Sequence, residues 1–200
     1  MKIIEGIKQE GKPFEIPDCT RDDLPEFFKE MGYRVGVEIG VQRGYYTKSL
    51  CEAGLKVYGI DPWLRYDDNL LSLKQYLHDK NYEESKATLA PYDCTLIRKT
   101  SMGAIKDFEN ESLDFVYIDG NHSFKYLTED IFEWSKKVRK GGVISGHDYI
   151  NRGPAGYCDV KWVIDAYTMA MKLPKWFILG RKKALSGERA DECRSWFWIK

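Results

Sequence analysis

Four acidic residues stand at or near the ends of apolar runs in the sequence: Glu38, Asp61, Asp119 and Asp148. Short apolar runs bounded by turn residues are typical of buried strands. In an open sheet of parallel strands, ligands bind at the carboxyl ends of those strands. The four carboxylates are therefore the first candidates for contacts to a ligand.

The first apolar run contains Glu38 and is followed by two glycines, Gly40 and Gly44, in the pattern E-x-G-x-x-x-G. A glycine in such a loop lets the backbone approach a ligand where a Cβ would clash. The helix that follows directs its free N–H groups at the same place. The pattern departs from the G-x-G-x-x-G fingerprint of dinucleotide enzymes, and an ordinary glycine turn is the alternative interpretation.

Asp61 ends the second run, about 20 residues past the glycine loop, where an acid can accept hydrogen bonds from both hydroxyls of a ribose. A cap for the next turn is the alternative role. Ser101 and Met102 follow the third expected strand, at 95–98. For Ser101 the alternative is to cap the helix that begins there.

Asp119 and Asp148 follow the fourth and fifth expected strands, which should be adjacent or nearly so. Their carboxylates are thus expected at the same edge of the sheet. Two histidines lie beside these acids in the sequence: His122 is three residues past Asp119, and His147 directly precedes Asp148.

Strands and helices alternate through most of the chain, which predicts a three-layer α/β fold with a mostly parallel sheet and helices on both faces. The last two strands, at 176–179 and 195–199, are close in sequence and should form an antiparallel hairpin. We expect one domain over residues 1–200. Residues 1–33 should form an N-terminal arm and a helix that starts at Thr20.

Residues 62–80 interrupt the alternation and are a candidate lid over the ligand face, with a short helix marked by Leu70, Leu73 and Leu77. A surface helix without a role is the alternative. Asn81 is the expected cap of a further helix. His78 belongs to the candidate lid, and we expect its side chain to be solvated.

Two segments carry a family resemblance: Tyr117-Ile-Asp-Gly-Asn-His-Ser123 and Gly141-Gly-Val-Ile-Ser-Gly-His-Asp-Tyr149. Together with the glycine loop they resemble the class I S-adenosylmethionine-dependent methyltransferases from about residue 35 to residue 200. The pair of segments is similar to the methyltransferase 24 family, which is related to macrocin-type sugar O-methyltransferases. The resemblance implies a seven-stranded Rossmann-like sheet and S-adenosylmethionine as the cofactor.

The resemblance also implies which residues hold that cofactor. The glycine loop would hold the methionine end, the acid after the second strand the ribose, and the pair after the third strand the adenine. The implied cofactor-binding residues are Glu38, Gly40, Gly44, Asp61, Ser101 and Met102, together with Asp119.

In metal-dependent members of this broad class, Asp119 and Asp148 would ligate a divalent ion such as Mg²⁺, and His122 would be the catalytic base. A hard ion bound by carboxylates orients an acceptor hydroxyl and lowers its pKa, and histidine is suited to take a proton near neutral pH. The sequence departs from the related catechol-type pattern, because Tyr149 stands where Asp or Asn follows the last acid. No third protein ligand is identified, and His147 is a second candidate base.

The reaction implied is O-methylation of a small hydroxylated molecule, a sugar or a similar metabolite. Its binding surface should come from residues 62–80, 150–158 and 181–194. Two alternatives stay open: a nicotinamide-dependent oxidoreductase, which shares an acid after the second strand, and a non-catalytic binding module built on a cofactor-binding fold.

The amino-acid composition limits the classes of partner that are expected for this chain. The chain has 31 basic and 31 acidic residues and a formal net charge of zero, which argues against general electrostatic binding to nucleic acid or a membrane surface. The five cysteines are scattered without a C-x-x-C pair, which favours a reducing, cytoplasmic location. The aromatic C-terminal hairpin is expected either in the core or at the interface of a homodimer.

Overall fold

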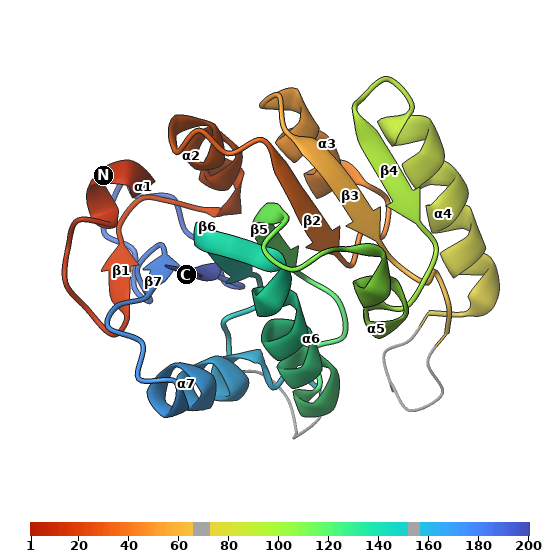
Figure 1. Cartoon of the computed structure of the whole chain (residues 1–200). Coiled ribbons are helices and arrows are strands. Elements are labelled where there is room, and N and C mark those ends of the chain that lie inside the picture. The colour runs from red at the N-terminus through yellow and green to blue at the C-terminus, as the bar shows by residue number, and fades with distance from the viewer. Residues whose placement is uncertain (66–72, 152–156) are drawn as a thin grey trace.

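Eight strands form one sheet in the order β1-β7-β8-β6-β5-β2-β3-β4, and helices lie on both of its faces (Figure 1). The structure is a computed structural model that describes residues 1–65, 73–151 and 157–200. The pairings are parallel apart from the two made by β8, which runs antiparallel to β6 and β7. The predicted three-layer, mostly parallel fold and its antiparallel C-terminal hairpin are confirmed.

The strands are β1 (Phe14–Ile16), β2 (Val35–Ile39), β3 (Lys56–Ile60), β4 (Cys94–Ile97), β5 (Leu113–Ile118), β6 (Val138–Gly146), β7 (Phe177–Leu179) and β8 (Trp196–Ile199). The α-helices are α1 (Ile3–Gly6), α2 (Leu24–Glu30), α3 (Tyr45–Glu52), α4 (Gln75–Leu89), α5 (Ser101–Ala104), α6 (Phe124–Lys137) and α7 (Val160–Ala170). Short 3₁₀ helices, η1 (Arg21–Asp23) and η2 (Ile105–Asp107), precede α2 and follow α5. Among the helices of the described residues, none is long and apolar enough to cross a membrane.

The sheet has one strand more than the seven expected. The added strand, β1, lies in the segment that was expected to form an arm, and it pairs in parallel with β7 from Phe14 opposite Phe177 to Ile16 opposite Leu179. Three residues between Pro13 and Pro17 are too short to show a period of two, and prolines are tolerated at the ends of an edge strand. A strand of this length therefore leaves no recognisable pattern in the sequence.

Side chains of the central strands alternate between two cores, as the pleat of a strand requires. In β5, Phe115 and Tyr117 pack with side chains of α2 and α3, while Val116 and Ile118 pack with side chains of α6 and α7. Both faces of the sheet are therefore buried, and its strands can present polar groups to a ligand mainly at their ends.

The start of the N-terminal helical segment is confirmed at Thr20. Its hydroxyl accepts a hydrogen bond from the Asp22 N–H at 3.4 Å, and the Asp23 carboxylate accepts one from the Thr20 N–H at 2.8 Å. This reciprocal capping satisfies the free N–H groups of η1. It fixes Arg21 at the beginning of the helical segment that leads into α2.

The expected helix start at Asn81 is wrong. A single helix, α4, begins at Gln75, and Asn81 lies inside it, buried, with its side-chain oxygen accepting a hydrogen bond from Arg43 Nε at 3.3 Å. Residues 75–80 of the candidate lid therefore form the first turns of α4. Leu70, one of the three leucines expected to mark its short helix, lies outside the described residues.

The aromatic residues of the C-terminal hairpin lie in the core. Trp196 and Phe197 are fully buried and Trp198 is 4% exposed. Trp196 stacks on Trp198 with ring centroids 5.3 Å apart. The hairpin thus joins the two halves of the core, and a homodimer stays a prediction.

Phe28 should be a strong stability determinant, because it is fully buried on α2 and stacks on Phe115 of β5 with centroids 4.4 Å apart. We expect Phe28→Ala to lower the free energy of unfolding by about 3–5 kcal/mol. The matched control is Phe124→Ala, at a side chain that is 62% exposed, with an expected change within about 0.5 kcal/mol. Urea denaturation followed by circular dichroism measures both, and similar losses in the two variants would contradict the packing described.

Candidate active site

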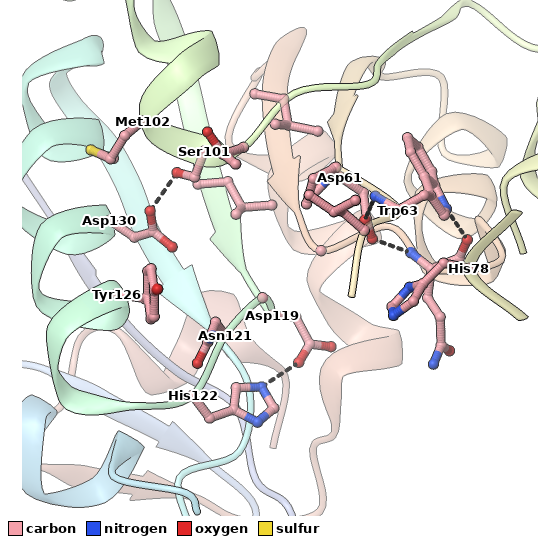
Figure 2. Close-up of a pocket in the computed structure, with 18 of the residues that line it drawn as sticks. Asp61, Trp63, His78, Ser101, Met102, Asp119, Asn121, His122, Tyr126 and Asp130 are labelled. Carbon is pink, nitrogen blue, oxygen red and sulfur yellow. Dashed lines mark hydrogen bonds and ion pairs between the residues drawn. The ribbon is translucent and has the colours of Figure 1, made fainter. Parts of the chain in front are cut away.

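A pocket of about 630 Å³ opens at the carboxyl edge of the sheet (Figure 2). Its lining comes from the ends of β2 and β3, from the residues after β3 and α4, from the loop and helix after β4, and from the loop after β5 together with α6. The volume lies in the range of small-molecule and cofactor sites, roughly 300–1,000 Å³. These loops lie at one edge of the sheet because β2 runs parallel to both of its neighbours. Ile39 at its end pairs with Ile60 of β3 and with Ile118 of β5.

Gly40 is the point of closest approach between two of these loops. Its φ is +93°, and a Cβ added there would lie 2.1 Å from the carbonyl oxygen of Asp119. No side chain fits in that space, and a left-handed φ favours glycine. Gly40 lines the pocket, so its backbone is open to a ligand.

Gly44 has a different role from Gly40. It precedes α3 with a φ of +82°, and an added Cβ would lie 2.9 Å from a methyl group of Leu89 in α4. It is buried and does not line the pocket. The second glycine of the motif therefore serves helix packing, and its expected contact with the cofactor stays a prediction.

Glu38 lies behind the glycine loop. It is 1% exposed, accepts a hydrogen bond from the Thr47 hydroxyl and does not line the pocket. Burial raises the pKa of this carboxyl well above its ordinary value, and the Thr47 bond offsets only part of that effect. Its predicted contact with the methionine end of a cofactor stays a prediction.

Asp61 presents its carboxylate to the pocket from the end of β3. One oxygen accepts a hydrogen bond from the Trp63 N–H at 2.7 Å and the other from the Gln42 N–H at 2.9 Å. These backbone bonds fix the side chain, and each carboxylate oxygen keeps a lone pair for a hydroxyl group. Burial raises the pKa of Asp61 above its ordinary value.

His78 contradicts the expectation of a solvated side chain. It lines the pocket from the first turns of α4, and its Nε2 is buried without a hydrogen-bond partner among the described residues. The difference arises because α4 begins earlier than the sequence suggested, which turns this residue inward beside Asp61 (Figure 2).

Ser101 and Met102 both line the pocket at the start of α5, and their expected contact with an adenine stays a prediction. The alternative role of Ser101 as a helix cap is wrong, because Thr100 is the cap and accepts a hydrogen bond from the Gly103 N–H at 3.1 Å. The Ser101 hydroxyl instead accepts a hydrogen bond from Trp134 Nε1 at 2.7 Å and donates one to Asp130.

Asp130 is a site residue that the sequence analysis missed. It lies on α6, is 4% exposed and lines the pocket next to Ser101 (Figure 2). Burial raises the pKa of Asp130 to about 7, against a smaller opposing effect of the Ser101 hydrogen bond.

The carboxylates of Asp119, which follows β5, and Asp148, which follows β6, both lie close to His122. His122 Nε2 lies 3.4 Å from Asp119 Oδ1 and 3.2 Å from Asp148 Oδ2. Burial disfavours the charged imidazole, but the hydrogen bond to Asp119 and the two negative charges outweigh burial and raise the pKa of His122. The structure thus brings together the three residues that the sequence predicted for metal binding and catalysis.

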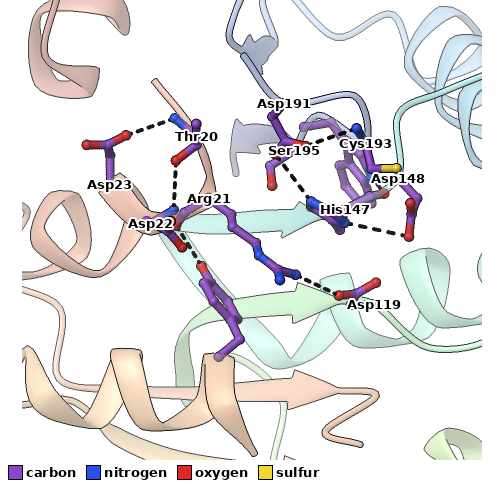
Figure 3. Close-up of polar contacts among 12 residues, drawn as sticks. Thr20, Arg21, Asp22, Asp23, Asp119, His147, Asp148, Asp191, Cys193 and Ser195 are labelled. Carbon is purple, nitrogen blue, oxygen red and sulfur yellow. Dashed lines mark hydrogen bonds and ion pairs between the residues drawn. The ribbon is translucent and has the colours of Figure 1, made fainter. Parts of the chain in front are cut away.

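Further charged side chains contact the two acids of this trio, as Figure 3 shows for Arg21 beside Asp119 and for His147 beside Asp148. Arg21 Nη1 lies 3.4 Å from Asp119 Oδ2, and His147 lies 3.6 Å from Asp148 and 3.5 Å from Asp191. Burial opposes the charge on His147, yet the nearby carboxylates of Asp148 and Asp191 raise its pKa to about 9. Burial raises the pKa of Asp148, but the neighbouring His147 and His122 outweigh it and lower that pKa to about 2.

Arg21 and Asp191 were not predicted from the sequence, although the segments that hold them were noted. Arg21 follows the cap residue Thr20, and Asp191 lies in the loop 181–194. Together with the trio and His147 they form a network of three carboxylates and three basic side chains. With both imidazoles protonated, the network carries three positive and three negative charges.

The donor atoms of Asp119, His122 and Asp148 are compatible with a divalent ion, because one from each residue lies within 4.8 Å of the others. Two carboxylates suit Mg²⁺, which completes its shell with water. Adding the His122 nitrogen makes a donor set that suits Mn²⁺, Fe²⁺ or Zn²⁺ better. The residues present therefore fit a metal ion.

The fold and the pocket at its carboxyl edge are those of the class I S-adenosylmethionine-dependent methyltransferases. Comparison with protein families matches residues 37–149, more than half of the chain, to Methyltransf_24, described as a methyltransferase domain. The chain belongs to this family. The matched range includes Gly40, Asp61, Asp119 and Asp148, and it ends at Tyr149.

Solved structures share the fold at low sequence identity. An O-methyltransferase from Bacillus cereus in complex with SAH is 17% identical, with a TM-score of 0.61 over 90% of this chain and 80% of that one. The O-methyltransferase TomG from Streptomyces achromogenes, in complex with SAM, is 14% identical, with a TM-score of 0.58 over 90% and 78%. A comparison with curated proteins gave no match.

Asp130 should make stability depend on pH. Its carboxyl holds a proton up to about pH 7 in the folded chain but loses it near its ordinary pKa of 3.8 when unfolded. Between these values only the folded state is protonated, so the free energy of unfolding falls as pH rises and levels off above about pH 7. At about 1.4 kcal/mol per pH unit, the upper limit of this fall is about 4 kcal/mol.

Urea denaturation of the wild type and Asp130→Asn at about pH 5 and about pH 8 measures this contribution. The variant should lose less stability between the two values, because Asn does not ionise. Glu38, whose pKa is also raised, contributes to both proteins and cancels. An equal pH dependence in the two proteins would contradict the buried, uncompensated state of Asp130.

Proposed function

We propose that this protein transfers a methyl group from S-adenosylmethionine to a hydroxyl oxygen of a small molecule. The observation that carries the proposal is the trio Asp119, His122 and Asp148, two of whose members line the same pocket as Gly40 and Asp61. Membership of a methyltransferase family supports the donor. The two O-methyltransferases with the same fold are consistent with an oxygen acceptor.

In this proposal the cofactor lies along the carboxyl edge of the sheet. The ribose hydroxyls donate to Asp61, whose carboxylate is already held by two backbone N–H groups. The adenine lies between the start of α5, at Ser101 and Met102, and α6. The methionine part passes Gly40, where the absence of a Cβ leaves the backbone accessible, and brings the methyl group near Asp119.

The reaction forms a bond between the acceptor oxygen and the methyl carbon and breaks the bond from that carbon to the sulfonium. The neutral thioether is a good leaving group, so catalysis consists mainly of orienting the acceptor and removing its proton. His122 or His147 would take that proton in its neutral form, which for His147, with a pKa of about 9, is the minor form at neutral pH. The neighbouring carboxylates would stabilise the resulting imidazolium.

A divalent ion at Asp119 and Asp148 would orient the acceptor hydroxyl and lower its pKa. His122 Nε2 faces both carboxylates, so this nitrogen cannot be a metal ligand and the catalytic base at once. If His122 is a ligand, His147 is left as the base. If the two carboxylates alone hold Mg²⁺, His122 is free to act.

For the acceptor, we propose a small hydroxylated metabolite such as a sugar, not a nucleic acid. The balanced charge of the chain and a pocket of about 630 Å³ support this choice. Five free thiols support a reducing, cytoplasmic location. We also propose a single domain over residues 1–200, and a homodimer is to be tested by light scattering.

Calorimetric titration with S-adenosylmethionine and S-adenosylhomocysteine tests the cofactor. We expect binding in the micromolar range, about −8 kcal/mol. Asp61→Asn should weaken it by about tenfold or more, because charge-assisted hydrogen bonds to the ribose are lost. Asp107→Asn, at an exposed surface acid, is the control and should bind like the wild type.

No heat with either ligand would contradict the proposed function. Titration with NAD(H) would then test the oxidoreductase alternative, and failure of all ligands would favour a binding module. With the cofactor bound, a screen of hydroxylated metabolites for methylated products by mass spectrometry identifies the acceptor class.

Titration of the S-adenosylhomocysteine complex with Mg²⁺ and Mn²⁺ tests the metal site without an activity assay. Asp148→Asn should weaken ion binding by about tenfold or more, since one of two carboxylate ligands is removed. Asp191→Asn is the matched control, because Asp191 contacts His147 but is not one of the three clustered donors. Absence of binding at millimolar ion, or equal losses in the two variants, would argue against a metal at the trio.

A further inference from the structure

The charged side chains around the trio form a series in which positive and negative groups alternate. The charged atoms of successive members lie within 3.6 Å of each other, in the order Arg21, Asp119, His122, Asp148, His147 and Asp191. Arg21 differs from the two histidines because its charge is permanent, since a guanidinium does not lose its proton in proteins. The carboxylate of Asp119 therefore has a positive charge beside it at every pH at which the protein is folded.

Arg21 reaches this series from the N-terminal segment, outside residues 37–149 that match the family. It is the first residue of η1 and directly follows the cap residue Thr20. Its guanidinium lies 5.4 Å from the centroid of the Tyr46 ring, and its Nη1 lies 3.4 Å from Asp119 Oδ2 (Figure 3). The capped turn and the ring thus fix a permanent positive charge next to a candidate metal ligand.

A divalent ion held by Asp119 and Asp148 would lie on the same carboxylate as Arg21. The guanidinium already compensates part of the charge that attracts the ion, and the two cations repel each other. With the screening of bulk water, a divalent and a monovalent cation on the order of 6 Å apart repel enough to change an affinity about tenfold. The side chains of Asp119 and Asp148 are 19% and 18% exposed, so screening is weaker here and the repulsion is larger.

We propose that Arg21 is a resident cation of this site, which compensates the charge of Asp119 and lowers the affinity of Asp119 and Asp148 for a divalent ion. The inference rests on the metal site of the proposed function, because it concerns the ion that these two acids would hold. It places a determinant of ion affinity in the N-terminal segment. If Arg21 only ties that segment to the sheet, its charge has no effect on ion binding.

Titration with Mn²⁺, with the free ion measured by electron paramagnetic resonance, tests the proposal. Arg21→Gln should bind Mn²⁺ about tenfold more tightly than the wild type, because the repulsion is removed. Arg21→Lys keeps the positive charge and should stay within about threefold of the wild type. Thermal unfolding checks that each variant is folded. If Arg21→Gln does not fold, Arg21→Met replaces it, since Met also lacks the charge and can cover the Tyr46 ring.

Arg139→Gln is the matched control, because the pair Arg139 and Asp114 lies at the opposite end of β5 from Asp119. Arg139 Nε lies 2.7 Å from Asp114 Oδ1, and its guanidinium lies 5.3 Å from the centroid of the Tyr33 ring. The two arginine side chains are similarly exposed, 42% for Arg139 and 38% for Arg21. The control changes the net charge of the protein by the same amount, and its affinity for Mn²⁺ should equal that of the wild type.

The titrations use the protein without S-adenosylhomocysteine, so their outcome does not depend on cofactor binding. Equal affinity of Arg21→Gln and the wild type overturns the role of Arg21 and leaves the metal site intact. The same holds if Arg21→Lys or Arg139→Gln gains as much affinity as Arg21→Gln. Absence of binding in all the proteins at millimolar Mn²⁺ overturns the inference together with the metal site. Methyl transfer itself is tested separately, by the titration with S-adenosylmethionine.

Discussion

The close approach of two loops at Gly40 is the constraint on which the site depends. The Gly40 N–H bonds to the Ile60 carbonyl at 2.8 Å, and the Asp119 N–H bonds to the Ile39 carbonyl at 2.8 Å. These bonds continue the parallel ladders one residue past the strands and bring the Asp119 carbonyl to where a Gly40 side chain would be. Because the backbones meet there, Asp61 and Asp119 face one pocket from neighbouring loops. A side chain at position 40 would separate them.

The parts of this arrangement that come from local pattern could be predicted from the sequence. Apolar runs that end in acids located the central strands, and the parallel fold then placed Asp61, Asp119 and Asp148 at one edge. The predictions that failed concern short or polar elements of secondary structure. The edge strand β1 is only three residues long, and α4 begins in a polar stretch where its first turn carries little apolar signal, so Asn81 looked like its start.

The residues missed at the site are those brought there by tertiary contacts. Arg21 meets Asp119 across 98 positions of sequence, and no local pattern reports such a pair. Asp130 is different, because the helical spacing of the sequence does indicate a buried position for it. It lies three residues after Leu127 and four before Trp134, which places it on the apolar face of α6. A carboxylate on the buried face of an amphipathic helix points to a ligand or to a buried partner.

The acids of the site fall into two electrostatic classes. Asp119, Asp148 and Asp191 each have a basic side chain within 4 Å, whereas Glu38, Asp61 and Asp130 have none among the described residues, and their pKa values are raised. Asp61 and Asp130 line the pocket proposed for the cofactor, whereas Glu38 is buried behind the glycine loop. The compensated acids lie where the proposed reaction would move a proton. In the proposed reaction the sulfonium loses its positive charge while the histidine gains one with the proton, so the total charge of the site stays unchanged, and this avoids the large energy of creating a net charge in a buried site.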